Sequence, residues 1–253
     1  MSKRLSKEQR EKCAREVEPI VLDFINKYNI TQPIEDSFKF IEDKIGYFIV
    51  SKKVDANISG FQYKIGNDKF IFINNNDDLG RQNQSLWHEV YHLYTGEGMG
   101  ISEIGSANYN IVECKADQFA SQILMNRRLV KEFVKNANTL DKGFFTQRDV
   151  IQMQQYFRVS FNNMCYVLNE LYGKKFLKGS YFQLGKIENR GKLLEITKRF
   201  GFDTRLSEIP EDNYISPKLF EYLSINMRDK KISAKRVNDI INFIELELGS
   251  NNE

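Results

Sequence analysis

The chain has 253 residues, of which 41% are hydrophobic and 28% are charged, the ordinary composition of a globular protein with room for one large domain or two modest ones. No segment approaches the ~18 consecutive apolar residues of a membrane-spanning helix, which excludes an integral membrane protein. The net charge of +3 comes from 37 basic and 34 acidic residues and is too balanced to indicate nucleic-acid binding.

The N-terminus and the cysteines indicate a cellular compartment. The first residues are basic but run into a charged segment and not an apolar one, so they do not form a secretory signal peptide. The three cysteines, Cys13, Cys114 and Cys165, are odd in number and widely spaced, which favours reduced thiols. We therefore expect a cytoplasmic protein.

The first quarter of the chain predicts two helices and then three strands. Residues 6–27 have apolar side chains at helical spacing, and Pro19 inside this segment is expected to kink or divide the helix. Pro33 is predicted to begin a second helix, which Gly46 ends. A hairpin is predicted between the last two of the strand-like segments, which are residues 47–50, 60–65 and 69–73.

The only two histidines, His88 and His92, lie four residues apart, and Glu89 follows the first. This H-E-x-x-H pattern is typical of zinc hydrolases, because positions i and i+4 share one face of a helix and two imidazoles there can bind one metal ion. Glu89 is then close enough to handle the proton of a metal-bound water. Residues 81–94 are apolar almost all round and contain no Pro or Gly, which predicts the buried helix that this site needs.

A zinc ion held by two histidines needs a third protein ligand and keeps one position open for water. The next predicted helix, residues 106–125, carries Glu113, which we favour as that ligand over Glu97 and Glu103 in the Gly-rich connection. Asp117 lies one turn further along the same face and is expected to accept the outer N–H of a ligand imidazole. For both carboxylates, an ordinary place on the helix surface is the alternative.

The expected cofactor is one Zn²⁺ per chain, with Mn²⁺ as an alternative. Enzymes of this type often use a His or Tyr as a further donor to the developing oxyanion. No His remains, and the sequence does not choose among Tyr91, Tyr94 and Tyr109.

Residues 146–172 contain two apolar helical segments around a short turn, and Ser160 is the predicted N-cap of the second. The arrangement is like a helix-turn-helix unit. A DNA-reading helix would need exposed basic or amide side chains near its start, and only Asn162 and Asn163 are present there. We therefore favour a packing pair, and DNA binding is not the favoured interpretation.

The last third of the chain predicts a linker at residues 173–179 and a small helical domain at 180–253, whose role the sequence does not reveal. Basic residues are concentrated at 174–205, which favours a solvated face over a surface for an acidic partner or DNA. The helical segments of this domain are residues 192–199, 217–227 and 234–248.

The two motifs and their order resemble the ImmA/IrrE family of metallopeptidases. Residues 84–94 read QSLWHEVYHLY, and residues 113–125 read ECKADQFASQILM, against a family pattern of HELGH followed by E-x-x-A-[ND]-x-F-A-x-x-L-L-M-P. The resemblance covers roughly residues 8–172. It departs at Tyr91, where the family has a small residue, at Arg81, a loose match to its arginine, and at Asn126, where it has proline. These departures bear on the substrate cleft and not on the proposed ligands.

The resemblance implies an α+β fold: a zincin-like metallopeptidase domain over residues 1–172, with a small sheet and active-site helices, followed by a mainly helical C-terminal region. It implies a zinc-dependent endopeptidase in which His88, His92 and Glu113 bind the metal and Glu89 is catalytic. Members of the family typically relieve a helix-turn-helix repressor, by cleavage or otherwise, and so derepress a phage, mobile-element or stress operon. The alternative is a non-proteolytic, metal-bound regulator that binds the repressor or DNA.

Overall fold

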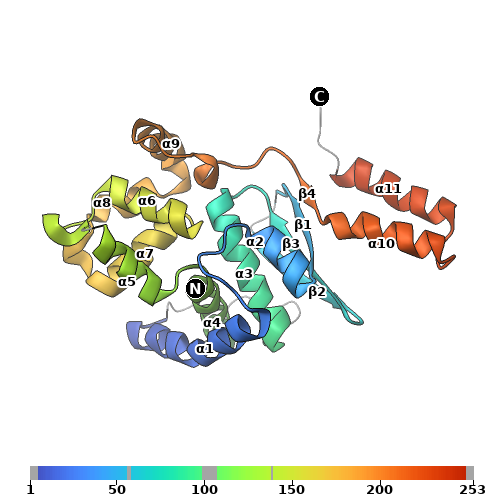
Figure 1. The fold of residues 1–253 in the computed structure, drawn as a ribbon, viewed down its shortest axis with the longest axis horizontal. Helices are drawn as coiled ribbons and strands as arrows, with labels where there is room; N and C mark the ends of the chain where they lie inside the picture. Colours follow the sequence, from blue (N-terminus) through green and yellow to red (C-terminus); the bar gives the residue numbers. More distant parts are fainter. Residues whose placement is uncertain (1–4, 56–57, 99–106, 138, 249–253) are drawn as a thin grey trace.

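The computed structural model describes residues 5–55, 58–98, 107–137 and 139–248, without the side chains of residues 107–110 and 247–248. Helices surround one small sheet, so the fold class is α+β (Figure 1). The N-terminal half contains α1 (Lys7–Tyr28), α2 (Ser37–Phe40), the π-helical turn η1 (Ile41–Ile45), β1 (Phe48–Lys52), β2 (Gly60–Ile65), β3 (Asp68–Asn74), α3 (Leu79–Thr95) and α4 (Ala107–Leu124). The C-terminal half contains α5 (Arg127–Asn136), α6 (Gln147–Phe157), α7 (Phe161–Tyr172), α8 (Gly179–Leu184), η4 (Ile187–Asn189), α9 (Arg190–Arg199), β4 (Tyr214–Ile215), α10 (Pro217–Arg228) and α11 (Ala234–Leu248).

The sheet has the strand order β2-β3-β1-β4. β1 is parallel to β3, while β2 and β4 run antiparallel to their neighbours. Side chains alternate between the two faces: Ile49 and Ile71 are buried on the inner face, whereas Phe48 and Phe70 stack on the outer face with ring centroids 5.0 Å apart. β2 is therefore an edge strand, and β3 connects it to the core.

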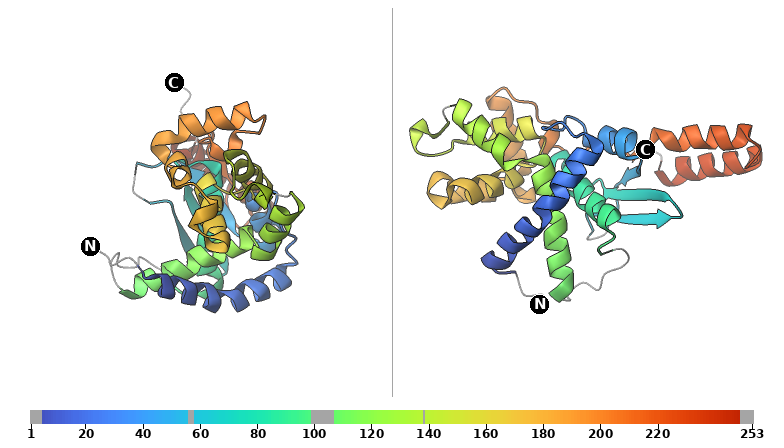
Figure 2. Two further views of the ribbon diagram at one scale, coloured as in Figure 1. Left: turned by 90° about the vertical axis from the view of Figure 1, so that its left-hand side faces the viewer. Right: turned by 60° about the horizontal axis from the view of Figure 1, so that its bottom comes forward.

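Part of the hydrophobic core lies between the inner face of the sheet and the N-terminal helices, and it continues into the C-terminal helices. α3 packs on β2 and β3, α4 packs on α3, and α1 packs on α4, so that α3 is buried in the middle of the domain (Figures 1 and 2). The fully buried side chains that α3 contributes are Leu86, Trp87, Val90 and Tyr91. The prediction of a buried helix around His88 and His92 is confirmed.

Two details of the predicted N-terminal helices change. α1 is a single helix from Lys7 to Tyr28 with Pro19 inside it, so it is not divided. The start of the second helix at Pro33 is wrong: α2 begins at Ser37, because the Asp36 carboxylate accepts a hydrogen bond from the backbone N–H of Lys39 at 3.0 Å and caps the helix there. The three predicted strands are found within two residues of their expected ends.

The helix pair α6–α7 is built as predicted and packs inside the molecule. Ser160 caps α7, accepting from the backbone N–H of Asn163 at 3.2 Å. The side-chain amide of Asn162 donates to the carbonyl of Gly185, and that of Asn163 donates to Oε1 of Gln84. The two amides that a DNA-reading helix would need are thus used in internal contacts, which supports a packing pair.

The segment after residue 172 is joined to the domain before it. One hydrophobic core includes Leu177 of the expected linker, Leu184 of α8, and Leu193 and Ile196 of α9. β4, which the sequence did not predict, pairs with β1. The division of the chain near residues 173–179 stays a prediction, and the core runs across it. The hairpin of α10 and α11 projects away from the body (Figures 1 and 2).

Among the helices in the described residues, none has both the length and the apolarity required to span a membrane.

Candidate metal centre

Helix α3 holds the two histidines in the positions that their spacing predicts. The helix begins where Oδ1 of Asp78 accepts from the backbone N–H of Arg81 at 3.0 Å, and it ends at Gly96, whose φ of 78° is left-handed. His92 is buried, and His88 is one turn closer to the start of the helix and slightly more accessible. Because α3 is packed on several sides, the rotamers of both imidazoles are fixed by their surroundings.

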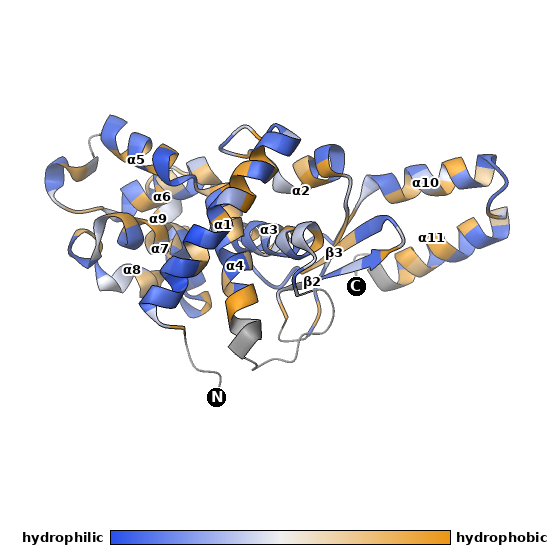
Figure 3. Ribbon diagram, turned by 90° about the horizontal axis from the view of Figure 1, so that it is seen from below, coloured by the Kyte–Doolittle hydropathy of each residue, from blue (hydrophilic) through white to orange (hydrophobic). Residues whose placement is uncertain are grey.

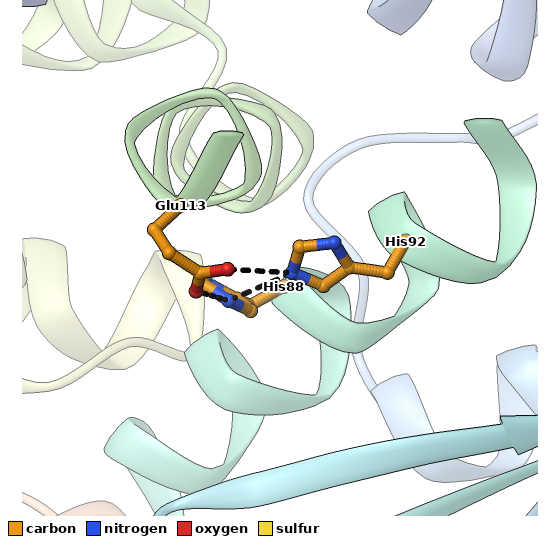
Figure 4. Close-up of side chains that lie close together, drawn as sticks. All are labelled: His88, His92 and Glu113. Carbon is orange, nitrogen blue, oxygen red and sulfur yellow. Dashed lines mark hydrogen bonds and ion pairs between the residues drawn. The ribbon is translucent and has the colours of Figure 1, made fainter. Parts of the chain in front are cut away.

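His88, His92 and Glu113 converge on one point between α3 and α4 (Figure 4). Nε2 of His88 lies 3.2 Å from Nε2 of His92 and 2.9 Å from Oε2 of Glu113. Oε1 of Glu113 lies 3.6 Å from Nε2 of His92. These are the only three His, Cys, Asp or Glu side chains among the described residues whose donor atoms gather closely enough to hold one metal ion.

The outer nitrogens of both imidazoles have acceptors. Nδ1 of His92 lies 2.8 Å from the backbone carbonyl of Glu97, and Nδ1 of His88 lies 2.9 Å from Oδ1 of Asp117. Because a carbonyl or carboxylate oxygen can only accept, each Nδ1 carries the hydrogen. In the neutral ring this leaves the lone pair on Nε2, which is the form that binds a metal.

The distances fit a zinc ion. Two nitrogens that each lie ~2.0–2.1 Å from a tetrahedral zinc ion are about 3.3 Å apart, and the observed separation of the two Nε2 atoms is 3.2 Å. Two imidazoles and one carboxylate are the ligand set of catalytic sites that keep a position open for water. The donor set and its spacing therefore suit Zn²⁺, and the same ligands can accept Mn²⁺.

The surroundings shift the pKa values of the two histidines in opposite directions. Burial lowers the pKa of His88, but its hydrogen bonds with Asp117 and Glu113 outweigh burial and raise the pKa to about 10. Burial and the nearby charge of His88 lower the pKa of His92. Without a metal ion, the His88 imidazole therefore holds a second proton and carries a positive charge between two carboxylates. A divalent cation that binds at the site replaces this positive charge.

Glu89 lies beside the ligands and is itself buried. Burial raises its pKa to about 7, and the neighbouring Glu113 also raises it. A methyl group added to Gly60, the first residue of β2, would lie 3.4 Å from Oε1 of Glu89 and only 2.8 Å from the carbonyl oxygen of Phe72. The Glu89 carboxylate therefore faces the start of the edge strand, at a place where only glycine fits.

The alternative candidates for the third ligand and for the oxyanion donor are not supported by the structure where it describes them. The Glu97 side chain accepts from the hydroxyl of Tyr91 at 2.7 Å and lies 3.8 Å from Nζ of Lys115, so it is not a ligand. The Tyr94 hydroxyl donates to Asp23 of α1. Both hydroxyls thus donate their hydrogen to a carboxylate, which argues against either tyrosine as the oxyanion donor. Glu103 and the side chain of Tyr109 lie outside the described residues.

Sequence reasoning missed the support around His92. The backbone carbonyl of Glu97 holds its Nδ1, and Gly98, with φ of 68°, lies so close that a methyl group there would be 2.8 Å from this nitrogen. A carbonyl has no signature in a sequence, but the glycines on either side of Glu97 were a signal that the backbone turns sharply here. Gln84 was also missed: its amide donates to the backbone carbonyl of Asp117 at 3.1 Å and joins α3 to α4.

Comparison with known proteins identifies the domain. The Peptidase_M78 family model, described as the IrrE N-terminal-like domain, matches residues 43–169. The match covers half of the chain and extends from within η1 into α7, with all the proposed ligands inside it. A search of curated proteins found no matching relative. The family match agrees with the resemblance noted in the sequence and with the α+β fold, and the chain therefore belongs to the ImmA/IrrE family of metallopeptidases.

Proposed function

We propose that this protein is a zinc-dependent endopeptidase that cleaves a helix-turn-helix transcriptional repressor and so derepresses a phage, mobile-element or stress operon in the cytoplasm. The observation that carries the proposal is the convergence of His88, His92 and Glu113, with Glu89 beside them, inside a peptidase-family domain. A purely structural zinc site prefers four protein ligands and needs no adjacent carboxylate. Three ligands with a buried glutamate favour hydrolysis.

Different residues of the site would perform the separate tasks of peptide hydrolysis. His88, His92 and Glu113 would hold the zinc ion, which when bound supplies Lewis acidity that activates a water and polarises the scissile carbonyl. Glu89 accepts the proton of the attacking water and passes it to the amine of the leaving peptide. Asp117 and the carbonyl of Glu97 hold the imidazoles in the required tautomer.

The edge strand β2 offers a way to position the substrate. One side of β2 pairs with β3, and no strand in the described part of the chain pairs with the other side. A peptide that adds to this free edge in an extended form would pass Gly60 and therefore Glu89. On the outer face of β2, Phe61, Tyr63 and Ile65 are exposed and are available to contact alternate side chains of such a peptide.

The proposal can be tested by co-expressing the chain with the helix-turn-helix repressor encoded next to it and a reporter of the repressed promoter. The forms compared are the wild type, Glu89→Ala and His92→Ala. Wild type is expected to shorten the repressor and switch the reporter on. Glu89→Ala is expected to retain zinc but leave the repressor intact, because only the proton acceptor is removed.

The outcomes separate the candidate functions. Cleavage that persists in Glu89→Ala would refute the mechanism proposed for Glu89. A reporter switched on by wild type and by Glu89→Ala, with the repressor intact in both, would show a non-proteolytic regulator that relieves repression by binding the repressor or DNA. An intact repressor and a silent reporter with the wild type would show that this repressor is not the substrate.

A further inference from the structure

The hairpin of α10 and α11, residues 217–248, is an isolated element that projects from the edge of the sheet (Figures 1 and 2). It contacts the body at its base, where the ring of Tyr222 lies 5.5 Å from that of Phe48 and Nζ of Lys218 donates to the carbonyl of Glu42. A unit this small, below the ~40 residues at which independent folding becomes difficult, usually needs a disulfide, a metal or a partner to be stable. The hairpin contains no cysteine or histidine.

The hairpin buries little of its own apolar surface. Leu223, Val237 and Ile244 are its buried hydrophobic side chains. Apolar and polar stretches alternate along both helices in Figure 3, and the large hydrophobic side chains left exposed are Phe220, Tyr222, Met227, Phe243 and Leu246. Phe243 is 62% exposed and Leu246 is 82% exposed. Five large apolar side chains left exposed on one short hairpin favour an interaction site.

Charge is distributed unequally along the same hairpin. The turn that joins the helices is basic: Asp229 is its one carboxylate, and its exposed cations are Arg228, Lys230, Lys231, Lys235 and Arg236. The end of the hairpin near the sheet carries Glu221 and Glu245, which are exposed and make no ion pair within the described residues, and Lys218, whose Nζ donates to the carbonyl of Glu42. The turn is therefore strongly positive, whereas at the base carboxylates outnumber cations.

From the apolar residues and the charge distribution together, we infer that the hairpin is a self-association surface whose partner is the same hairpin of a second copy of this chain. When two copies pack antiparallel about a two-fold axis, the basic turn of each lies against the acidic base of the other. Phe243 and Leu246 are then covered in a four-helix bundle, an arrangement in which two helical hairpins complete one core.

The charge pattern favours a second copy over other occupants. A basic protein or an anionic membrane would match only one end of the hairpin, whereas an inverted copy matches both. An isologous interface also requires that one patch be complementary to itself, which a positive end and a negative end on the same element provide. The dimer does not depend on hydrolysis, since the hairpin extends away from α3 and α4, the helices of the candidate metal centre (Figure 1).

The first test is the mass of the full chain measured by sedimentation equilibrium over a range of concentrations. Wild type is expected to be a dimer at micromolar concentration, and Phe243→Glu or Leu246→Glu is expected to be a monomer. Ile187→Glu, which changes another exposed apolar residue, 54% exposed in η4, is the control and is expected to stay dimeric. Thermal unfolding of each variant at low concentration checks that the monomer remains folded.

The second test is charge reversal. Lys230→Glu with Lys231→Glu is expected to weaken the dimer at least about tenfold, as is Glu221→Lys with Glu245→Lys. The four changes together are expected to restore most of the affinity, because opposite charges again face each other. A wild type that stays monomeric at high concentration, or a dimer that Leu246→Glu leaves unchanged, would overturn the inference. Two charge reversals that add instead of compensating would overturn the antiparallel arrangement.

Discussion

Two helix pairs in this protein have opposite surroundings: α3–α4, which carries the proposed metal ligands, and α10–α11, which projects from the sheet. α3 is packed by the sheet and by α4, and α4 is packed in turn by α1. The two imidazoles of α3 are held by hydrogen bonds: His88 by Glu113 and Asp117 of α4, and His92 by the backbone carbonyl of Glu97. The projecting hairpin has few contacts and leaves Leu246 almost fully exposed. A site that must hold a metal ion in fixed geometry requires the first kind of setting, whereas a surface for association requires the second.

The largest effect is expected when a ligand is removed from the packed pair. His92→Ala should lower zinc affinity by far more than ~100-fold, since even the loss of a group that only orients a ligand costs 10–100-fold. Zinc per purified chain, measured by inductively coupled plasma mass spectrometry, should fall from about one to about zero. Zinc retained at one per chain in this variant would contradict the ligand assignment. Leu246→Ala, in the hairpin, is the control and should bind zinc as wild type does.

Packing behind the ligands should matter next. Phe119 of α4 is fully buried, 5.6 Å from the ring of Tyr91 and 5.2 Å from that of Phe24. Phe119→Ala should lower the free energy of unfolding by about 3–5 kcal/mol, because it removes a large side chain and leaves a cavity. Equilibrium denaturation by urea measures this. A loss below ~1 kcal/mol would show that α4 is not tightly packed against α3 and α1.

A smaller effect is expected from the carboxylate that orients His88. Asp117→Asn should weaken zinc binding about tenfold, at the lower end of the range for such partners. The amide oxygen can still accept from Nδ1, and the Asp117 side chain is 65% exposed, so that solvent screens its charge. Competition with a fluorescent chelator gives the affinity. Glu132→Gln, an exposed carboxylate on α5, is the control, and an equal loss in both variants would contradict the orienting role.

The smallest effect is expected in the hairpin. Phe243→Ala should change the free energy of unfolding of the monomer by less than about 0.5 kcal/mol, since its side chain contributes little to the folded chain by itself. The same denaturation experiment at low protein concentration measures it. A loss comparable to that of Phe119→Ala would show that the hairpin is packed as tightly as α4 and would remove the contrast between the two regions.

The convergence of His88, His92 and Glu113 could be predicted from the sequence because its signal is local. The spacing of His88 and His92 fixes their common face on a helix, and Glu113 and Asp117 are one turn apart on the next helix. When α3 and α4 pack together, the two carboxylates lie opposite the histidines and within hydrogen-bonding distance of His88. The carbonyl of Glu97 could not be predicted, because any residue supplies one and only the fold brings it to His92.

The parts of the fold that were missed depend on contacts between distant segments. β4 is only two residues long and has no strand pattern of its own, and it exists because Tyr214 and Ile215 pair with β1. The continuity of the core past residue 172 likewise depends on Leu193 and Ile196, whose spacing predicts a helix but not the surface that it covers. Periodicity identifies helices, while their partners are decided by the tertiary structure.

The most direct test of the metal centre as a hydrolytic site uses purified protein. Wild type and Glu89→Gln, each loaded with one zinc ion per chain, are mixed with the purified repressor, and the fragments are identified by mass spectrometry. Wild type should cut at one or a few peptide bonds and stop when the metal is chelated, while Glu89→Gln should be slower by about 10²–10⁴-fold, the contribution of a positioned acid–base group. Equal cleavage rates for the two zinc-loaded proteins would contradict the account.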